Sequence, residues 1–329
     1  MNTAHIILKT SLLLALLALC PGCGDTPDNA QAAKAKAPEP VTLLLNWYPE
    51  VEHGGYFSAQ ADGYYAGQNL DVDIQDGGPS APVMQKVAGG DLVFGIANAD
   101  DVVNAQAADA DIVALLAPIQ VNPRCIMVRA DSGIREFTDL KDMTLAMSPR
   151  PSFSHYLKKK FALDKVRIVP YPSNIQTFLT EKNFAQQAYN FSEPFLAEKQ
   201  GVAVRVLMVA DTGFNPYASV LVTRRKTITE HPELVRKMVR ASALGWLHYL
   251  KSPDAANQMI NKQNPLMGLD CLNFGVEKLA PMVLTDEAQA SGLGTMRAER
   301  WKILVEQMTW AGIVKPGVVD PEKIYNNKF

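Results

Sequence analysis

The chain has 329 residues, of which 47% are hydrophobic and 20% are charged, and its 32 basic and 34 acidic residues give a net charge of -2. This is ordinary for a globular protein of one or two lobes, with a core that needs neither disulfides nor metal ions for support. Because no block of lysine and arginine stands out, the sequence carries no electrostatic footprint for a nucleic-acid partner.

A short apolar run near the N-terminus indicates a targeting segment. Lys9 precedes residues 11–19, which are nearly all leucine and alanine. A membrane-spanning helix needs about 20 apolar residues, whereas the core of a secretory signal peptide is shorter. We therefore predict that residues 1–23 direct export of the protein.

Two cysteines directly follow this run, where a bacterial lipoprotein would be cut just before a cysteine. Cys23 is preceded by the small Gly22, whereas the residue before Cys20 is a bulky leucine. We predict a lipid on Cys23 that anchors the protein to the membrane, with Cys20 as the alternative and secretion without an anchor as the other outcome. The pair also has C-x-x-C redox spacing, but no strand and helix surround it to lower a thiol pKa.

Residues 24–40 are small, polar and proline-containing, which predicts a flexible tether. After this tether, short apolar runs alternate with helical patterns. Strands are predicted at residues 41–45, 70–74, 92–96 and 112–116, and helices at 54–68, 80–87 and 100–108. Such alternation indicates parallel crossover units and an open α/β sheet.

The same alternation starts again in the middle of the chain. Strands are predicted at residues 145–147, 166–169, 187–189 and 204–208, and helices at 152–161, 175–181 and 194–200. A last strand at residues 218–222 is followed by helical patterns to the end, where His231-Pro and Ser252-Pro mark helix starts.

We therefore predict two lobes, the first of which is interrupted by the second. Residues 41–130 and 215–329 form the first lobe, and residues 131–214 form the second. The two crossings would act as a hinge of two strands, near residues 125–128 and 217–222. A cleft between α/β lobes is a favourable ligand site, because strand carboxyl ends and helix N-termini from both sides point into it.

Motifs of catalysis and metal binding are missing from the sequence. It has no G-x-G-x-x-G, P-loop, H-E-x-x-H or G-x-S-x-G pattern, and its five histidines show no metal-ligand spacing. We expect no metal, no cofactor and no enzymatic activity. Cys125 and Cys271 lie far apart in the sequence, and they are either buried, unpaired thiols or a disulfide.

The most informative segment is the turn after the first predicted strand, which ends at Asn46. In this turn and the helix that follows, Trp47 and Tyr56 can offer flat faces to an aromatic ligand. Asn46, Glu50 and His53 can hydrogen-bond to the edge of such a ligand. Alternatively, the aromatic residues pack on the core and the polar residues cap the helix.

Residues 45–74 resemble the opening of the binding proteins for thiamine-pyrimidine precursors and of their relatives for sulfonates, nitrate and riboflavin. The shared pattern is a strand, Asn-Trp, a proline, a histidine, a helix ending in Gly-Tyr-Tyr, and then Leu-Asp-Val. The matching stretches are residues 46–47, 49, 53, 62–65, 69–72, 95–101, 132–134, 139–141, 192–194, 294–296 and 300–301. These matches are specific for the superfamily, but they do not specify the ligand.

This resemblance implies an α/β, two-lobed periplasmic binding protein of type II, a Venus-flytrap that delivers a small molecule to an ABC permease. It implies a monomer in the periplasm or at the cell surface. The candidate ligand-binding residues are Asn46, Trp47, Glu50, His53, Gly54, Tyr56, Asn98, Asp100, Asn122, Ser152, Phe153, Ser154, Tyr189, Asn190 and Glu193. For those of the second lobe, helix capping or core packing is the alternative role.

Two departures from the family pattern bear on a turn and on the ligand. Asp142 stands where a glycine commonly follows Asp-Leu-Lys. Glu50 and Glu52 stand where pyrimidine binders commonly carry uncharged polar residues. These acids would repel an anion but would accept hydrogen bonds from N–H groups, which favours a flat, nitrogen-rich heterocycle such as an aminopyrimidine. Arg124 and Arg150 keep a sulfonate or nitrate open as the ligand.

Two other classes of function remain as alternatives. Fungal proteins that resemble this fold make the thiamine pyrimidine with a cysteine-rich run and a lysine-held pyridoxal phosphate, and this chain has no cysteine cluster in its folded region. A periplasmic sensory or scaffold module could use the same fold. The gene neighbourhood separates these outcomes, because permease and ATPase genes indicate transport and a kinase gene indicates sensing.

Overall fold

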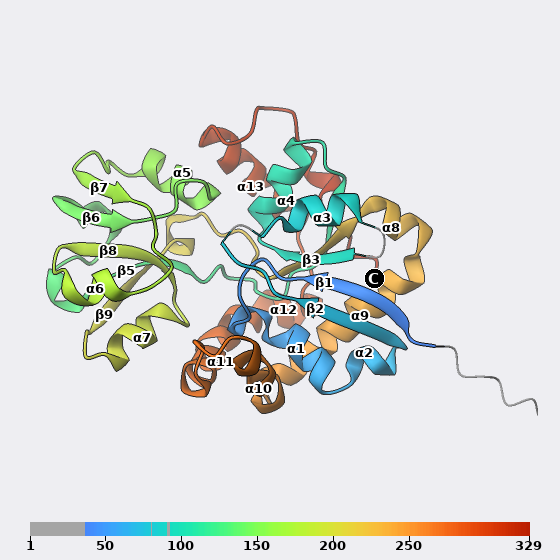
Figure 1. Cartoon of the computed structure of the whole chain (residues 1–329). Coiled ribbons are helices and arrows are strands. Elements are labelled where there is room, and N and C mark those ends of the chain that lie inside the picture. Colours follow the sequence, from blue (N-terminus) through green and yellow to red (C-terminus); the bar gives the residue numbers. More distant parts are fainter. Residues whose placement is uncertain (1–36, 80, 91–92) are drawn as a thin grey trace, which may run out of the picture. The chain divides into compact units, whose positions relative to one another are not determined.

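Two five-stranded mixed sheets form the framework of the structure, a computed structural model that describes residues 37–79, 81–90 and 93–329 (Figure 1). The α/β class predicted from the alternation of strands and helices is confirmed. The predicted signal peptide, most of the predicted tether and both candidate lipidation residues lie outside the described residues.

The first sheet has the strand order β2-β1-β3-β10-β4. Its strands are β1 (Glu39–Leu44), β2 (Leu70–Gln75), β3 (Val93–Ala97), β4 (Ile112–Leu116) and β10 (Val220–Arg224). β1, β2 and β3 run parallel, and β10 is antiparallel to both of its neighbours. In β2 the predicted alternation is observed, because Leu70, Val72 and Ile74 are buried and the residues between them are exposed.

The second sheet has the strand order β7-β6-β8-β5-β9. Its strands are β5 (Arg124–Arg129), β6 (Met143–Ala146), β7 (Val166–Val169), β8 (Phe184–Tyr189) and β9 (Val204–Met208). β6 is parallel to β7 and β8, whereas β5 is antiparallel to β8 and β9.

The chain passes from the first sheet to the second through residues 117–123 and returns through residues 209–219. β5 pairs within the second sheet, although the sequence analysis placed its residues at the end of the first lobe. β4 and β5 are both apolar and buried, so their local patterns do not reveal which sheet each one joins. The first crossing therefore precedes residues 125–128.

The helices are α1 (Gly54–Ala61), α2 (Tyr64–Gly67), α3 (Val83–Gly89), α4 (Ala99–Ala107), α5 (Ser152–Lys160), α6 (Gln176–Thr180), α7 (Glu193–Lys199), α8 (Arg225–Glu230), α9 (Pro232–Tyr249), α10 (Asp254–Gln263), α11 (Leu269–Val283), α12 (Asp286–Ser291) and α13 (Ala298–Trp310). The single helix expected over residues 54–68 is two helices. Gly63, with a φ of 75°, separates them, because this left-handed conformation ends a helix and favours glycine.

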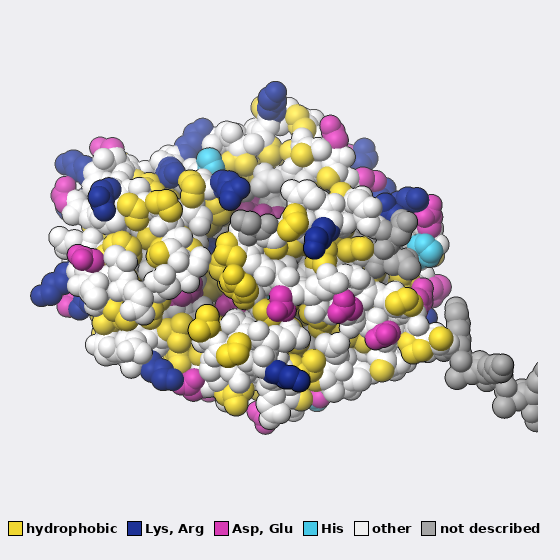
Figure 2. Space-filling model, viewed as in Figure 1, with side chains coloured by type: hydrophobic (Ala, Val, Ile, Leu, Met, Phe, Trp, Pro, Cys, Tyr) yellow, Lys and Arg dark blue, Asp and Glu magenta, His cyan; other side chains and the backbone are white. Residues whose placement is uncertain are grey.

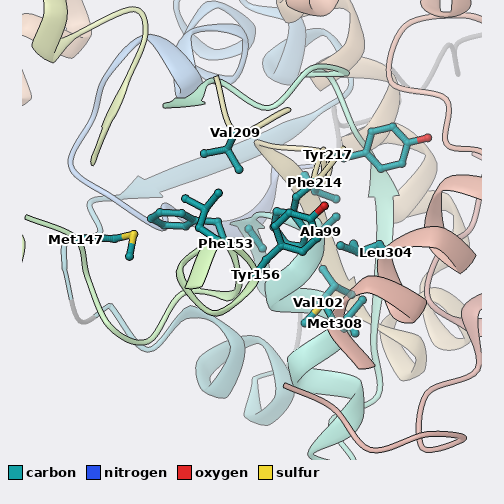
Figure 3. Close-up of a cluster of buried hydrophobic side chains, with 14 of the residues drawn as sticks. Ala99, Val102, Met147, Phe153, Tyr156, Val209, Phe214, Tyr217, Leu304 and Met308 are labelled. Atoms are coloured by element: carbon teal, nitrogen blue, oxygen red, sulfur yellow. The ribbon is translucent and has the colours of Figure 1, made fainter. Parts of the chain in front are cut away.

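Buried side chains form a hydrophobic core on each face of the first sheet. Along β10, Val220 and Val222 belong to one cluster and Leu221 to the other, as the alternation of side chains along a strand requires. The first of these clusters also contains side chains of the second sheet and of α5 and α13, and Figure 3 shows where Phe153, Tyr156, Leu304 and other members meet. Apolar packing therefore joins elements of both sheets.

Glycine residues let α1 and α9 approach each other closely. A Cβ atom on Gly245 would lie 2.2 Å from the carbonyl oxygen of Gly55, and one on Gly54 would lie 2.0 Å from the ring of Tyr249. Larger residues would push the two helices apart. Gly54 therefore has a packing role in this fold.

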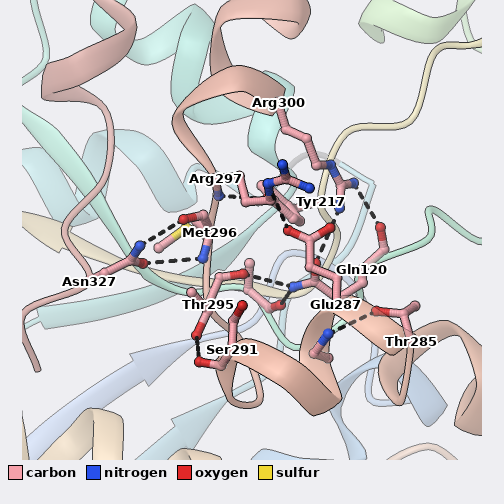
Figure 4. A network of polar contacts seen from close by, with 12 residues as sticks. Gln120, Tyr217, Thr285, Glu287, Ser291, Thr295, Met296, Arg297, Arg300 and Asn327 are labelled. Carbon is pink, nitrogen blue, oxygen red and sulfur yellow. Dashed lines mark hydrogen bonds and ion pairs between the residues drawn. The ribbon is translucent and has the colours of Figure 1, made fainter.

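One arginine hydrogen-bonds to both of the segments that connect the two sheets. Arg300 on α13 donates from Nη2 to the backbone oxygen of Gln120 at 2.7 Å and to that of Asn215 at 2.9 Å. Its guanidinium also lies 3.7 Å from the centre of the Tyr217 ring (Figure 4). Gln120 belongs to the first crossing, and Asn215 and Tyr217 belong to the second.

The structure describes Cys125 and Cys271 as buried, free thiols, which agrees with the first of the two readings of the sequence. Burial raises the pKa of both thiols, that of Cys271 to about 12. Within the described part of the chain, none of the helices has the length and apolar character that a membrane crossing requires.

Candidate functional site

Residues of both sheets line a cavity of about 840 Å³. Much of its wall follows the carboxyl ends of parallel strands. β1 and β3 are neighbours in the first sheet, and β6 and β8 are neighbours in the second. Side chains that follow these strands converge on one space, which is the usual arrangement of ligand sites in α/β proteins.

The turn after β1 supplies part of the cavity wall on the side of the first sheet. Asn46, Trp47 and Glu50 line the cavity there. Trp47 is half-buried and packs edge-on against Tyr48, with ring centres 5.6 Å apart. Asn98, which follows β3, lines the cavity beside them, and its buried Oδ1 has no hydrogen-bond partner among the described residues.

His53 lies behind this wall and is fully buried. The backbone N–H of Glu50 donates to His53 Nδ1 at 3.3 Å, and His53 Nε2 lies 2.9 Å from Asn46 Oδ1. Burial lowers the pKa of His53 to about 3, so the ring is neutral and carries its proton on Nε2. Nε2 therefore donates to Asn46 Oδ1, and the amino group of Asn46 is the end that hydrogen-bonds to Glu52.

Glu52 lines the cavity although only 1% of its surface is exposed. Its Oε1 lies 3.4 Å from His53 Nε2, and its Oε2 has no hydrogen-bond partner among the described residues. Burial raises the pKa of Glu52 to about 7, against the charge of Arg124 and hydrogen bonding by Tyr189 and Asn46, which lower it. Glu52 is a carboxyl group that titrates near neutral pH.

Glu193, the first residue of α7, lines the cavity on the side of the second sheet. Its Oε1 accepts a hydrogen bond from the Tyr171 hydroxyl at 2.6 Å. Its Oε2 accepts from the backbone N–H of Tyr189 at 2.9 Å and from the Ser192 hydroxyl at 2.6 Å. These three donors fix the position of the carboxylate.

Arg124, at the start of β5, places a positive charge in the cavity wall. Its guanidinium carbon lies 4.0 Å from the ring centre of Tyr189 and 5.1 Å from that of Phe153. Burial by itself lowers the pKa of Arg124, but the charges of Tyr189, Glu193 and Glu52 raise it by more. The pKa is therefore above its usual value, and the guanidinium stays protonated.

Acidic groups outnumber basic ones in the described wall of the cavity. Burial raises the pKa of Asp100, and burial together with the charge of Asp100 raises that of Asp101 to about 7. Burial and the charge of Glu52 raise the pKa of Glu50 well above its usual range. The carboxyl groups are Glu50, Glu52, Asp100, Asp101 and Glu193, and the guanidinium groups are Arg124 and Arg150.

Six predicted ligand residues are not among those that line the cavity, namely His53, Gly54, Tyr56, Ser152, Ser154 and Asn190. Tyr56 is fully buried, its hydroxyl donates to the Ser219 carbonyl at 2.6 Å, and its ring packs on Trp246. It is on the face of α1 that meets α9, which the sequence could not distinguish from the face toward the turn. Gly54 packs against α9, and the Ser154 hydroxyl donates to the Ser148 carbonyl at 2.6 Å.

Further predicted residues connect parts of the chain. Asn104 donates from Nδ2 to the Ser152 hydroxyl at 3.3 Å, and Ser152 also hydrogen-bonds to Asp100, so it links α5 to α4. Asn122 lines the cavity, but its Nδ2 donates to a carbonyl of the second crossing and its Oδ1 accepts from the Arg124 N–H. Asn190 is not among the cavity-lining residues.

The structure adds cavity residues that were not in the predicted set. They are chiefly Glu52, Arg124, Arg150, Tyr171 and Gln187. Glu52 and the two arginines entered the sequence analysis as charges that bear on the ligand. Tyr171 follows β7 and Gln187 lies inside β8, and no motif marks either position.

Among the described residues, no group of three or more histidine, cysteine or acidic side chains could hold a metal ion. On the face shown in Figure 2, lysine and arginine side chains are scattered singly among acidic and apolar ones.

The two sheets and the cavity that both of them line are those of the periplasmic-binding-protein fold. The structure aligns with that of the periplasmic aliphatic sulphonate binding protein SsuA from Escherichia coli with a TM-score of 0.67 and 14% sequence identity, over 87% of this chain and 92% of that chain. The predicted fold is thereby confirmed.

The chain belongs to the NMT1/THI5-like family, whose match covers residues 50–256. It is 26% identical over 344 residues to the riboflavin-binding protein RibY of Chloroflexus aurantiacus, covering 97% of this chain and 95% of that protein. It is 24% identical over 315 residues to the formylaminopyrimidine-binding protein of Halalkalibacterium halodurans, covering 91% of each. The family predicted from the turn after β1 is confirmed.

Proposed function

We propose that this protein is the binding component of an ABC import system and that it captures a small nitrogen heterocycle of the aminopyrimidine type in the cavity between its sheets. It acts as a monomer and is held at the membrane by a lipid on Cys23. The observation that carries the choice of ligand is the excess of carboxyl groups in the cavity wall.

This excess disfavours an anion. A sulfonate or nitrate would gain from two arginines but would lie beside five carboxyl groups, and it would be repelled by each of them that is ionised. Four of these groups have raised pKa values, and an anion beside them would have to be accompanied by further proton uptake. A heterocycle with N–H groups instead donates hydrogen bonds to these carboxyl groups. The two relatives described above are named for riboflavin and formylaminopyrimidine, both of which are nitrogen heterocycles.

The proposed contacts come from both sheets. Trp47 offers its indole for stacking, and Asn46, Asn98 and Glu193 offer polar atoms at the edge of a ring. Tyr189 and Phe153 hold Arg124 in place, and Arg124 can donate hydrogen bonds to a carbonyl oxygen or an anionic substituent of the same ligand.

Calorimetry of the mature protein against aminopyrimidines, riboflavin, taurine and nitrate tests the ligand class. We expect binding of at least one heterocycle with submicromolar affinity, weakened about 10- to 100-fold by Trp47→Ala because stacking and apolar contact are lost. Tyr48→Ala is the matched control, since Tyr48 is exposed beside Trp47 and does not line the cavity. Tight binding of taurine or nitrate alone would reject the ligand class.

Binding without turnover separates this proposal from an enzyme of the same family. Ligand recovered from the complex after prolonged incubation is expected to have an unchanged mass. A new product that accumulates with time would show catalysis and would overturn the assignment as a binding protein.

A further inference from the structure

Helices α7 and α11 contact each other outside the cavity (Figure 1). The rings of Phe195 on α7 and Phe274 on α11 are stacked, with their centres 4.8 Å apart and their planes inclined by 28°. Nζ of Lys199, at the end of α7, donates to Oδ2 of Asp270 in the first turn of α11. An exposed ion pair adds little to stability, whereas a stacked aromatic pair adds more than the area it buries. The ring pair is therefore the stronger part of this α7–α11 contact.

Helix α7 begins in the wall of the cavity that the second sheet contributes. Its first residue is Glu193, whose carboxylate lines the cavity and is fixed by three hydrogen bonds. Phe195 lies two residues further along the same helix. A displacement of Phe195 away from α11 therefore moves this wall of the cavity as well.

Helix α11 packs against the wall that the first sheet contributes. A Cβ atom on Gly275 of α11 would lie 2.4 Å from Cγ2 of Val51, in the turn after β1. Val51 is fully buried and stands between Glu50 and Glu52, both of which line the cavity. Since Phe274 precedes Gly275, adjacent residues of α11 contact α7 and this turn. Helix α11 thus links the two walls of the cavity from outside.

The ring pair lies at the margin of the hydrophobic cores. Phe195 and Phe274 are both half-buried, and Phe274 is not a member of the three clusters of buried side chains in the described part of the chain. Its ring also lies 5.3 Å from Nζ of Lys278, on the same helix. Removing the ring of Phe274 should therefore break the α7–α11 contact while each sheet keeps its core.

We propose that the α7–α11 contact holds the two walls of the cavity together in the ligand-free protein. Phe195 and Phe274 are then positioning residues for binding, although neither is among the described residues that line the cavity. A ligand that touches both walls binds less tightly in proportion to the fraction of molecules whose walls are apart. This inference goes beyond the proposed function, because it concerns the arrangement of the walls and applies to any ligand that contacts both.

Small-angle X-ray scattering of the ligand-free mature protein tests the contact. Phe274→Ala is expected to increase the radius of gyration because the walls separate, whereas Phe274→Tyr keeps the stacked ring and should match the unmodified protein. Phe161→Ala is the matched control. It removes another stacked pair, with Phe137 at 5.1 Å, but both of these residues lie between the two crossings, so the radius of gyration should not change.

Calorimetry with riboflavin and with 2-methylpyrimidin-4-amine gives a second readout. For a probe that binds the unmodified protein, Phe274→Ala and Phe195→Ala should each raise Kd about 3- to 10-fold. The double variant should bind no more weakly than the single ones, because all three lack the same contact.

Additive effects on Kd, or the same radius of gyration with and without the ring pair, would contradict the role of the contact. If Phe274→Ala does not fold, Phe195→Leu provides the same comparison. The scattering experiment needs no ligand, so failure of both probes to bind would count against the proposed function alone.

Discussion

At the scale of single residues, the turn after β1 combines groups whose protonation is set by burial. His53 is a neutral hydrogen-bonding element at physiological pH, because burial holds its pKa near 3. Glu52 beside it titrates near pH 7. Near neutral pH, therefore, His53 keeps the same charge whereas the carboxyl group of Glu52 changes its charge.

The titration of Glu52 predicts how stability depends on pH. Its pKa is about 7 in the folded protein and near 4.5 in the unfolded chain, so the folded state binds the extra proton between these values. Its contribution to stability is complete below pH 4.5 and is lost as pH rises through 7, whereas the lowered pKa of His53 acts in the opposite direction. Relative to the unmodified protein, Glu52→Gln should thus gain up to about 3 kcal/mol in the free energy of unfolding between pH 4.5 and pH 8.

Urea unfolding of the ligand-free proteins at several pH values measures this difference, and the His53 contribution cancels because it is common to both. A constant difference across the range would show that Glu52 has an ordinary pKa in the folded protein.

The candidate site could be predicted from the sequence most directly where a residue lies next to a recognisable strand end. Asn46, Trp47 and Asn98 follow strands whose apolar runs are clear, and all three line the cavity. Tyr56 was misplaced because the helical pattern of α1 does not say which face meets α9. The sequence predicted Glu52 as an acid that accepts hydrogen bonds from the ligand, but its burial could not be predicted because it depends on packing of the whole turn.

At the scale of elements, the contact between α1 and α9 positions the turn after β1, because this turn leads directly into α1. Gly54 and Gly55 begin α1 directly after His53, and they pack on the rings of Tyr249 and Trp246 in α9. The apolar periodicity of α9 predicted its buried face, but no pattern in the sequence identified α1 as the element that packs there.

Gly245→Ala tests this helix contact. A Cβ there would lie 2.2 Å from the Gly55 carbonyl oxygen and 2.6 Å from Ala59, so the two helices must separate. We expect a loss of about 1–3 kcal/mol in the free energy of unfolding, measured by urea denaturation. Gly67→Ala, where an added Cβ meets nothing within 4 Å, should be neutral or stabilising by up to about 1 kcal/mol. Equal effects of the two substitutions would argue against a tight contact.

At the scale of the whole molecule, the alternation of strands and helices was enough to predict two α/β sheets. The course of the chain between them was harder to predict, because β5 pairs with β8 and β9 through backbone hydrogen bonds that a local pattern does not encode. Arg300, which contacts both crossings, gave no signal in the sequence because its partners are distant backbone carbonyls.

The proposed anchor is also a property of the whole molecule and concerns residues outside the described range. The mature protein is expected to begin at Cys23 with a diacylglyceryl group, which intact-mass spectrometry would detect. Cys23→Ser should move the protein from the membrane fraction to the soluble fraction, whereas Cys20→Ser should leave it membrane-bound. An unmodified N-terminus in the unsubstituted protein would reject the anchor.

The convergence of strand ends on the cavity places many of the residues that can contact a ligand in turns rather than in the hydrophobic cores. Much of the wall is made of turns after β1, β3, β6 and β8, while the cores lie on the faces of the sheets. Replacing the sequences of these turns is therefore a way to change which ligand is bound while the two sheets and their cores are kept. A protein of this design is a suitable starting point for sensors of small metabolites.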